Sequence, residues 1–166
     1  MPTRIKLADG HMAALPDPFT YVDDEAELVP GDVILSLTRF QAEGDRLLSE
    51  GRAIGVRLKS DEEAEALAYD LPRLSVVALE FPKFRDGRAY SNARILRERY
   101  GFKGELRAVG DVLREQAGFM VRCGFDAFEP ADGSTPEQWA VAARRYRHVY
   151  QPSVDRRAPA YLERQA

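Results

Sequence analysis

Short apolar runs alternate with amphipathic segments along most of the chain. The runs cover residues 33–37, 53–58, 74–81, 105–109 and 125–129, and the run at 74–81 is the most apolar. Nearly continuous apolar runs of this length are typical of strands that are covered on both faces. The pattern therefore predicts five core strands.

Helix signals follow the strands. Thr38 with Gln41, and Ser60 with Glu63, have the spacing of a capping box and precede apolar stripes. Thr135 begins a third capping box, which has a proline at the first helical position. Each of these sites predicts the start of a helix.

Two further helices are predicted between residues 82 and 124. One follows the charged loop at 82–87 and ends at Tyr100 and Gly101. Asp111 can cap the other, and Gly124 is placed to end it.

This alternation predicts an α/β fold in which helical crossovers join parallel strands. We expect a mostly parallel sheet of about five strands, doubly wound, with a partial α/β barrel as the alternative. The length of 166 residues indicates one α/β domain, at residues 31–150. Residues 1–30 read as an irregular lead-in in which one short edge strand can form at 19–22, and residues 151–166 as a surface tail.

Composition narrows the function classes. The net charge of −3, from 24 basic and 27 acidic side chains, offers no general attraction to nucleic acid. No apolar run is long enough to cross a membrane and no secretion signal is present, so we expect a cytoplasmic protein. The single cysteine, Cys123, excludes an internal disulfide and shares an apolar stripe, where a buried thiol is expected. The alternative is a redox-active or nucleophilic thiol. With only two histidines, no transition-metal site is expected.

A candidate site lies where the predicted strands end, because ligands of open α/β sheets gather at the carboxyl ends of the strands. The polar residues at this rim are Thr38, Lys59, Ser60, Glu80, Lys83, Arg85, Asp86, Asp111 and Glu129. Glu80 follows four apolar residues, so its carboxylate should be partly buried and need a partner. Glu80 and Asp111 are the catalytic candidates, and the alternative for Glu80 is a salt-bridge anchor.

The loop after the third predicted strand is strongly cationic. Lys83, Arg85, Arg88 and Ser91 lie around the start of a predicted helix, where a phosphate, sulfite or carboxylate can bind. The alternative is that these cations pair with nearby carboxylates or remain solvated.

Two aromatic residues in the same region, Phe84 and Tyr90, are candidates for binding a partner protein. The sequence has no GxGxxG, Walker, GxSxG or HExxH motif, so it indicates no particular cofactor.

Four stretches resemble a family of bacterial proteins. They are LEFPKFRDGRAYS at 79–91, LRERYG at 96–101, GELRAVGDVLR at 104–114 and RCGFDAF at 122–128. The similarity runs from about Gly31 to Glu129. Ala117 and Gly118 stand where the family has a bulky apolar pair, so helix packing or a partner surface should differ there.

Members of that family are described as probable oxidoreductases involved in sulfite reduction, from genes beside that of the sulfite reductase haemoprotein. The resemblance implies an accessory or oxidoreductase-like component of assimilatory sulfite reduction, with the haemoprotein as partner. It supplies no catalytic residues. Two alternatives stay open: an independent enzyme that acts on a small anionic metabolite, and a non-catalytic binding or regulatory module.

Overall fold

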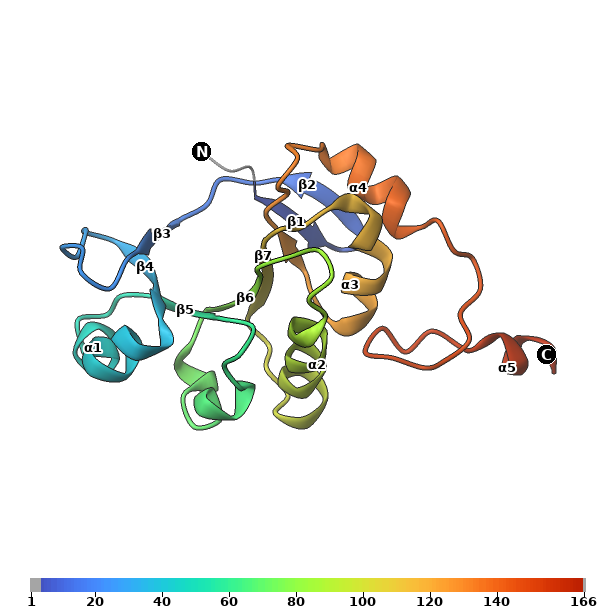
Figure 1. Cartoon of the computed structure of the whole chain (residues 1–166). Coiled ribbons are helices and arrows are strands. Elements are labelled where there is room, and N and C mark those ends of the chain that lie inside the picture. Colours follow the sequence, from blue (N-terminus) through green and yellow to red (C-terminus); the bar gives the residue numbers. More distant parts are fainter. Residues whose placement is uncertain (1–3, 166) are drawn as a thin grey trace.

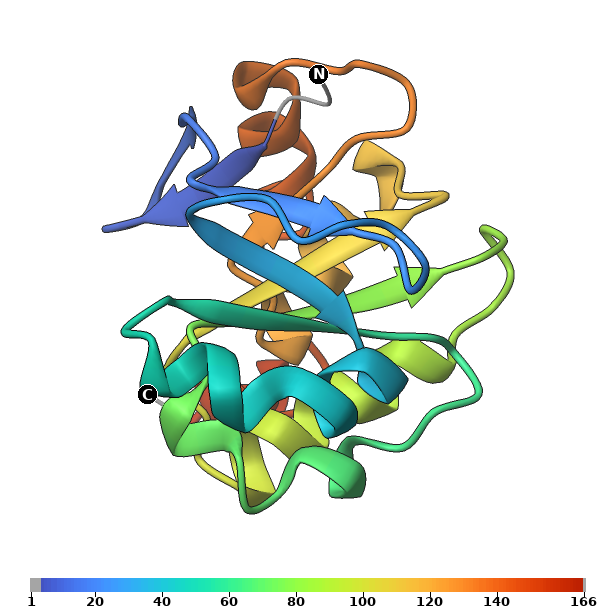
Figure 2. The ribbon, with the colours of Figure 1, turned by 90° about the vertical axis from the view of Figure 1, so that its left-hand side faces the viewer.

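The computed structural model describes residues 4–165 and shows a curled sheet with helices on its outer side (Figures 1 and 2). The eight strands are β1 (Ile5–Ala8), β2 (His11–Ala14), β3 (Phe19–Val22), β4 (Asp32–Ser36), β5 (Ile54–Leu58), β6 (Val76–Phe81), β7 (Glu105–Gly110) and β8 (Ala127–Phe128). Their order in the sheet is β2-β1-β8-β7-β6-β5-β4-β3. The residues outside this description, 1–3 and 166, belong to the two predicted terminal segments.

The helical segments connect these strands. The α-helices are α1 (Leu37–Ser49), α2 (Arg88–Arg94), α3 (Ala117–Cys123), α4 (Pro136–Ala143) and α5 (Ala160–Glu163). The 3-10 turns are η1 (Ala64–Leu67), η2 (Leu71–Arg73) and η4 (Arg114–Gln116), and η3 (Ile95–Arg99) is a π-helical turn that continues α2. Among residues 4–165, no helix has the length and apolar character needed to span a membrane.

The expected open, doubly wound sheet of about five strands is wrong, and the alternative, a partial barrel, fits. Strands β3 to β8 pair in parallel, whereas β1 pairs antiparallel with both β2 and β8. The eight strands curl into a half-barrel whose helices lie outside (Figure 1). Because the sheet curls, its helices lie on the outer side only, and side chains of the strands themselves line the inner face.

All five core strands predicted from apolar runs are present, and the edge strand at 19–22 is confirmed as β3. The structure adds β1 and β2 within the first 30 residues, for which the sequence predicted little regular structure. The connection from β2 to β3 crosses the open side of the half-barrel (Figure 1). This connecting segment, residues 15–18, is called the strap below.

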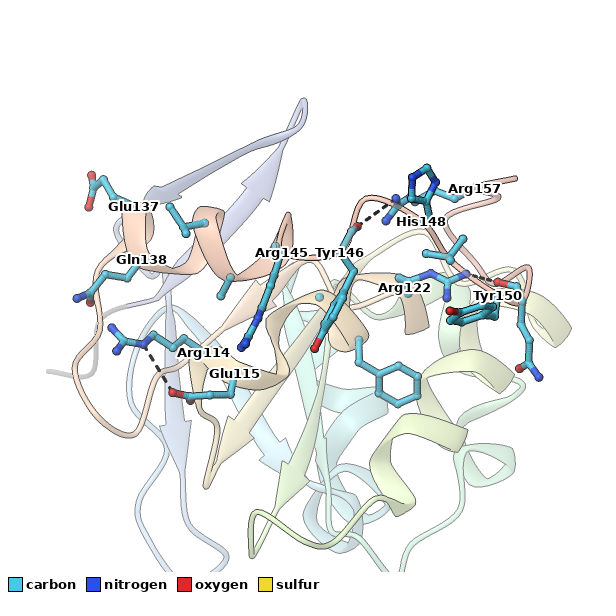
Figure 3. A pocket seen from close by; sticks show the side chains of 17 residues that line it. Arg114, Glu115, Arg122, Glu137, Gln138, Arg145, Tyr146, His148, Tyr150 and Arg157 are labelled. Atoms are coloured by element: carbon cyan, nitrogen blue, oxygen red, sulfur yellow. Dashed lines mark hydrogen bonds and ion pairs between the residues drawn. The ribbon is translucent and has the colours of Figure 1, made fainter. Parts of the chain in front are cut away.

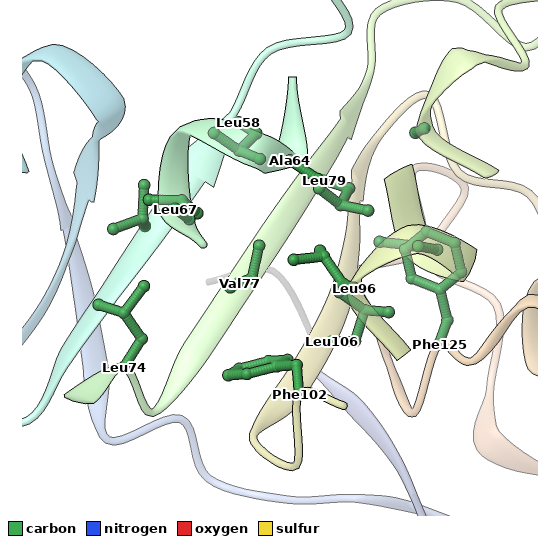
Figure 4. Packing of buried hydrophobic residues seen from close by; sticks show 14 of the residues in the cluster. Leu58, Ala64, Leu67, Leu74, Val77, Leu79, Leu96, Phe102, Leu106 and Phe125 are labelled. Carbon is green, nitrogen blue, oxygen red and sulfur yellow. The ribbon is translucent and has the colours of Figure 1, made fainter. Parts of the chain in front are cut away.

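The hydrophobic core lies between the outer face of the sheet and the helices (Figure 4). Val77 and Leu79 of β6 and Leu106 of β7 point outward and are at most 1% exposed. Leu96 and Phe102, from the segment after α2, pack in the same cluster. Because alternate residues of a strand face opposite sides, the remaining positions of these strands line the inside of the half-barrel.

Charged side chains occupy many of those inward positions. The parallel register aligns Arg57 with Ala78 and Ala78 with Arg107, and two residues further along it aligns Glu80 with Val109. Arg107 is fully buried at 0% exposure. Strands expected to be apolar on both faces therefore have an inner face that mixes small apolar and charged residues.

Local helix signals were confirmed at some sites and wrong at others. Thr135 caps α4, and Gly124 ends α3 with a φ of 106°. The cap of α1 is Ser36, whose hydroxyl accepts from the Arg39 amide at 3.1 Å, and Thr38 lies inside the helix. Asp111 caps no helix. Its carboxylate accepts a hydrogen bond from the amide of Phe84 instead, at 2.8 Å, and the turn that follows begins after Leu113.

The segment after Ser60 forms the short turns η1 and η2 instead of the predicted α-helix. The amide of Ala64 donates to the Asn92 side chain at 3.3 Å, and the Asn92 amide group donates to the Glu62 carbonyl at 2.9 Å. A distant side chain thus satisfies backbone groups that a continuous helix would pair internally.

Candidate functional site

The loop between β6 and α2, together with the first turn of α2, carries most of the side chains that the sequence singled out. Lys83, Arg85 and Ser91 are exposed, as is Phe84, at 46%. Arg88 donates to both oxygens of Asp86, at 3.0 and 2.6 Å, and also to the hydroxyl of Ser60 at 2.8 Å. The hydrogen bonds from Arg88 lower the pKa of Asp86 well below its ordinary value, so this ion pair persists at neutral pH.

This arrangement weakens the predicted anion site. The Arg88 guanidinium already has a carboxylate partner, and α2 is a helix of only seven residues. Lys83 and Arg85 take part in none of the ion pairs described within residues 4–165 and extend into solvent. The loop therefore resembles a solvated charged surface more than a built anion site.

The two catalytic candidates have different partners. Glu80 faces the inside of the half-barrel, where its Oε2 accepts from Arg57 Nε at 3.0 Å and Nη2 at 2.9 Å. Asp111 holds the amide of Phe84 and thus fixes the loop after β6. The structure gives Asp111 a positioning contact and places Glu80 in a polar cluster.

Arg107 is the centre of the second part of that cluster. It donates to Asp17 of the strap at 2.7 and 3.0 Å, to Glu105 at 2.8 Å and to Glu129 at 2.9 Å. Burial alone would lower the pKa of Arg107, but the hydrogen bonds to Asp17 and the surrounding charges raise it. The guanidinium therefore stays charged inside the half-barrel.

Tyr21 completes this network from β3. Its hydroxyl donates to Glu129 at 2.6 Å, and the guanidinium of Arg107 lies 5.9 Å from the centre of the Tyr21 ring. Burial, together with the Glu129 carboxylate, raises the pKa of Tyr21 above its ordinary value, so the phenol remains a proton donor at neutral pH.

Sequence reasoning missed Tyr21, Arg57 and Arg107. The available signal was the placement of charged residues inside otherwise apolar strands. Arg57 and Arg107 lie on the same side of their strands as Glu80, which period-two alternation could have shown. Only contacts between distant segments reveal that Tyr21 joins them.

A second feature, on the outer side of the molecule, is a groove of about 1030 Å³ between α3, α4 and the chain that follows α4 (Figure 3). Phe119, Val141, Tyr146 and Tyr150 line it and are 57%, 74%, 69% and 88% exposed. Arg145 and Tyr146 reach into the groove from the chain after α4 (Figure 3). We call this region the aromatic groove.

Arg122 at the end of α3 anchors the far wall of the aromatic groove. Its Nε donates to Asp155 at 3.0 Å, and its carbonyl accepts from Ser153 Oγ at 2.7 Å and the Val154 amide at 3.1 Å. Between α4 and this anchor, the chain leaves the side chains of Tyr146 and Tyr150 exposed. The C-terminal segment, expected to lie on the surface, thus builds one side of the groove.

Tyr90, a predicted partner-binding residue, lies beside this groove. Its ring centre is 4.6 Å from that of Phe119, a groove residue, and 5.1 Å from that of Phe81 in the core. Tyr90 is half-buried and packs against Phe119, whereas Phe84 is on the β6–α2 loop, away from this contact.

Cys123 is 1% exposed, and burial raises its pKa to about 11, so its thiol is protonated at neutral pH.

Fold and surface together define an α/β half-barrel protein with a polar inner face and an exposed aromatic groove. A family model described as "Bacterial protein of unknown function (DUF934)" matches residues 55–161. The match covers more than half of the chain, so the protein belongs to this bacterial family. No curated protein gives a significant match.

The family match starts and ends later than the expected range from Gly31 to Glu129. It includes Arg57, Glu80 and Glu129 of the inner face, and it includes the chain that forms the aromatic groove. Tyr21 and the strap precede it.

Proposed function

We propose that the protein is an accessory component of assimilatory sulfite reduction that acts by docking onto the sulfite reductase haemoprotein. The observation that supports docking is the aromatic groove, and the link to sulfite reduction comes from the sequence resemblance. In this proposal the haemoprotein supplies the redox chemistry, and the present chain supplies a binding surface that aids electron delivery, assembly or activation.

The side chains of the aromatic groove have the composition of a protein interface. Tyrosine, phenylalanine and arginine are enriched in such interfaces and contribute most of the binding energy. Val141 and Phe119 offer exposed apolar area, and Tyr146 and Tyr150 are large exposed side chains with few rotatable bonds. An exposed apolar patch of this kind is typical of a binding site.

Charge indicates which partner surface fits. The groove is lined by Arg114, Arg122, Arg145 and Arg157 and by two glutamates, and residues 144–165 contain six arginines against two acidic residues. This basic region belongs to a chain whose net charge is −3. We infer that the occupant is an apolar segment flanked by carboxylates, because opposite charges steer and align association.

The alternative of an independent enzyme for a small anionic metabolite receives less support at the site first predicted for it. Its anion clamp would need free cations around the β6–α2 loop, and Arg88 is bound by Asp86 and Ser60. A regulatory module remains compatible with the same groove, and the growth experiment below separates it from a role in sulfite reduction.

The proposed function predicts a conditional growth defect. A strain that lacks the gene should grow poorly with sulfate or sulfite as sulfur source and normally with cysteine. The matched extract should lose sulfite reductase activity and regain it on addition of the purified protein. Normal growth of the deletion strain on sulfate would contradict the proposal.

Docking itself is tested by titrating the purified full chain with purified haemoprotein. Tyr146→Ala should weaken binding by about tenfold or more, as expected for an interface aromatic. Tyr69→Ala is the matched control, because Tyr69 is 97% exposed and lies between η1 and η2, outside the groove. Equal affinities of the two variants would place the contact elsewhere.

A further inference from the structure

The inner face of the half-barrel contains a pocket of about 290 Å³ that the proposed docking function does not use. Tyr21, Arg57, Glu80, Gly110 and Glu129 line it, together with Val109. They come from β3, β5, β6 and β7 and from the residue after β8, so the pocket lies at the carboxyl ends of the parallel strands. Ligands of α/β proteins characteristically bind at that end.

One wall of this pocket depends on a close approach of two strand ends at Gly110. Gly110 ends β7 with a φ of 95°, and a Cβ atom there would lie 2.4 Å from the carbonyl oxygen of Phe81. Only glycine therefore allows the ends of β6 and β7 to approach in this way. The amide of Asp111 donates to the same Phe81 oxygen at 2.7 Å and holds the strand ends together.

Polar atoms of both signs converge on the pocket with part of their hydrogen-bonding capacity unused. Glu80 binds Arg57 through Oε2 alone, and Glu129 binds Tyr21 and Arg107 through Oε1 alone. The hydrogen bonds described within residues 4–165 leave Oε1 of Glu80, Oε2 of Glu129 and Nη1 of Arg57 to accept or donate further. The Arg57 side chain is 42% exposed, so its guanidinium can meet a ligand from solvent.

This arrangement selects against ligands of a single charge. Two carboxylates in the lining repel a simple anion such as sulfite, and Arg57 repels a simple amine. A molecule with a carboxylate for Arg57 and an ammonium group for Glu80 and Glu129 satisfies both. The volume of 290 Å³ suits a molecule with a small side chain.

We propose that this inner pocket binds a small zwitterion of the α-amino acid class, with its carboxylate at Arg57 and its ammonium group between Glu80 and Glu129. The site lies inside the half-barrel and shares no lining residue with the aromatic groove. It therefore does not depend on the docking proposal, and either can fail without the other.

The test is calorimetric titration of the full chain with glycine, L-serine and L-cysteine, each compared with acetate, methylamine and sulfite. At least one amino acid should bind about tenfold or more tightly than each singly charged probe, because it makes one more ionic contact. No heat from any amino acid up to about 10 mM, or equal binding of acetate, methylamine or sulfite, would overturn the proposal.

Variants locate the binding within the pocket. Glu80→Gln keeps the shape of the side chain, and Arg57→Met keeps its length, so each removes charge with little change in volume. Both should weaken amino acid binding by about tenfold or more. Arg88→Met is the control, because Arg88 is exposed in an ion pair at the start of α2, outside the pocket.

Circular dichroism and thermal unfolding of each variant establish that it is folded before titration. Unchanged affinity in both folded pocket variants would show that the amino acid binds elsewhere and would overturn the assignment. If one variant fails to fold, the other decides the outcome, since Arg57 and Glu80 lie on different strands.

Discussion

At the scale of single residues, Glu105 shows how a largely buried carboxylate remains ionised. Burial alone would raise the pKa of Glu105, but the hydrogen bond from Arg4 and the charges of Arg107 and Lys6 lower it below its ordinary value. The Arg4 contacts measure 3.2 and 2.6 Å, and the Lys6 ammonium is 3.2 Å away. Three cations from β1, β7 and the residue before β1 thus share one carboxylate.

This environment predicts a specific dependence of stability on pH. Because the folded state lowers the pKa of Glu105, its contribution is present above the unfolded value near 4.5 and is lost as the pH falls through the folded pKa. Glu105→Gln should therefore be less stable than the wild type at pH 7, and the difference should shrink below about pH 4. Urea unfolding between about pH 7 and pH 3 measures it.

The exposed variant Glu50→Gln, whose partner Arg46 lies on the surface of α1, is the control and should change stability little at any pH. A difference between Glu105→Gln and the wild type that stays constant down to pH 3 would contradict the assignment.

At the scale of elements, α1 depends on a cap that its local sequence leaves ambiguous. Ser36 and Thr38 are both residues that cap helices, but only Ser36 precedes the first turn, with a φ of −64° and a ψ of 160°. Its hydroxyl also donates to the carboxylate of Asp24, in the loop before β4. The cap therefore links the start of α1 to that loop.

Ser36→Ala should lower the free energy of unfolding by about 1 kcal/mol, because it removes the cap and the Asp24 contact. Thr38→Ala should change it by less than about 0.5 kcal/mol, because Thr38 is an exposed residue inside the helix. Equilibrium unfolding in urea compares the two. A larger loss for Thr38→Ala would show that the helix starts two residues later than the structure places it.

Elements whose signal lies in their own sequence were predictable, and elements that depend on contacts with distant segments were not. Continuous apolar runs located β4 to β7 because burial of both faces is visible in the sequence itself. The hairpin of β1 and β2 was missed because it is held by β8, and the turns η1 and η2 were mistaken for a helix because Asn92 supports them from α2. Glu80 was predictable as a buried carboxylate, but its partner Arg57 depends on strand register.

At the scale of the whole molecule, Arg107 closes the half-barrel. From β7 it binds Asp17 of the strap and Glu129 after β8, and it lies beside Tyr21 of β3. These segments are distant in sequence, so one guanidinium joins the edge strand β3 and the strap to β7 and β8 in the middle of the sheet. The charges are matched inside a buried region, where an unpaired charge is costly.

Arg107→Met should lower the free energy of unfolding by about 3–5 kcal/mol, because it leaves buried carboxylates without their counter-charge. Arg46→Met should cost at most about 1 kcal/mol, because its ion pairs on α1 are exposed. Urea unfolding at pH 7 measures both. Similar small losses in the two variants would show that Arg107 is dispensable for closure.

The pairing of β1 with β8 also sets an order for folding during synthesis. Lys6 of β1 meets Asp126, beside β8, across 120 residues of chain, whereas β4 to β7 pair with neighbours that leave the ribosome soon after them. At ordinary translation rates the first strand waits on the order of ten seconds for β8, although its other partner, β2, follows it directly. In nascent chains arrested before residue 127, the β1–β2 hairpin lacks β8, and a two-stranded hairpin alone is only marginally stable. The amides of this hairpin should therefore exchange faster than those of the central strands.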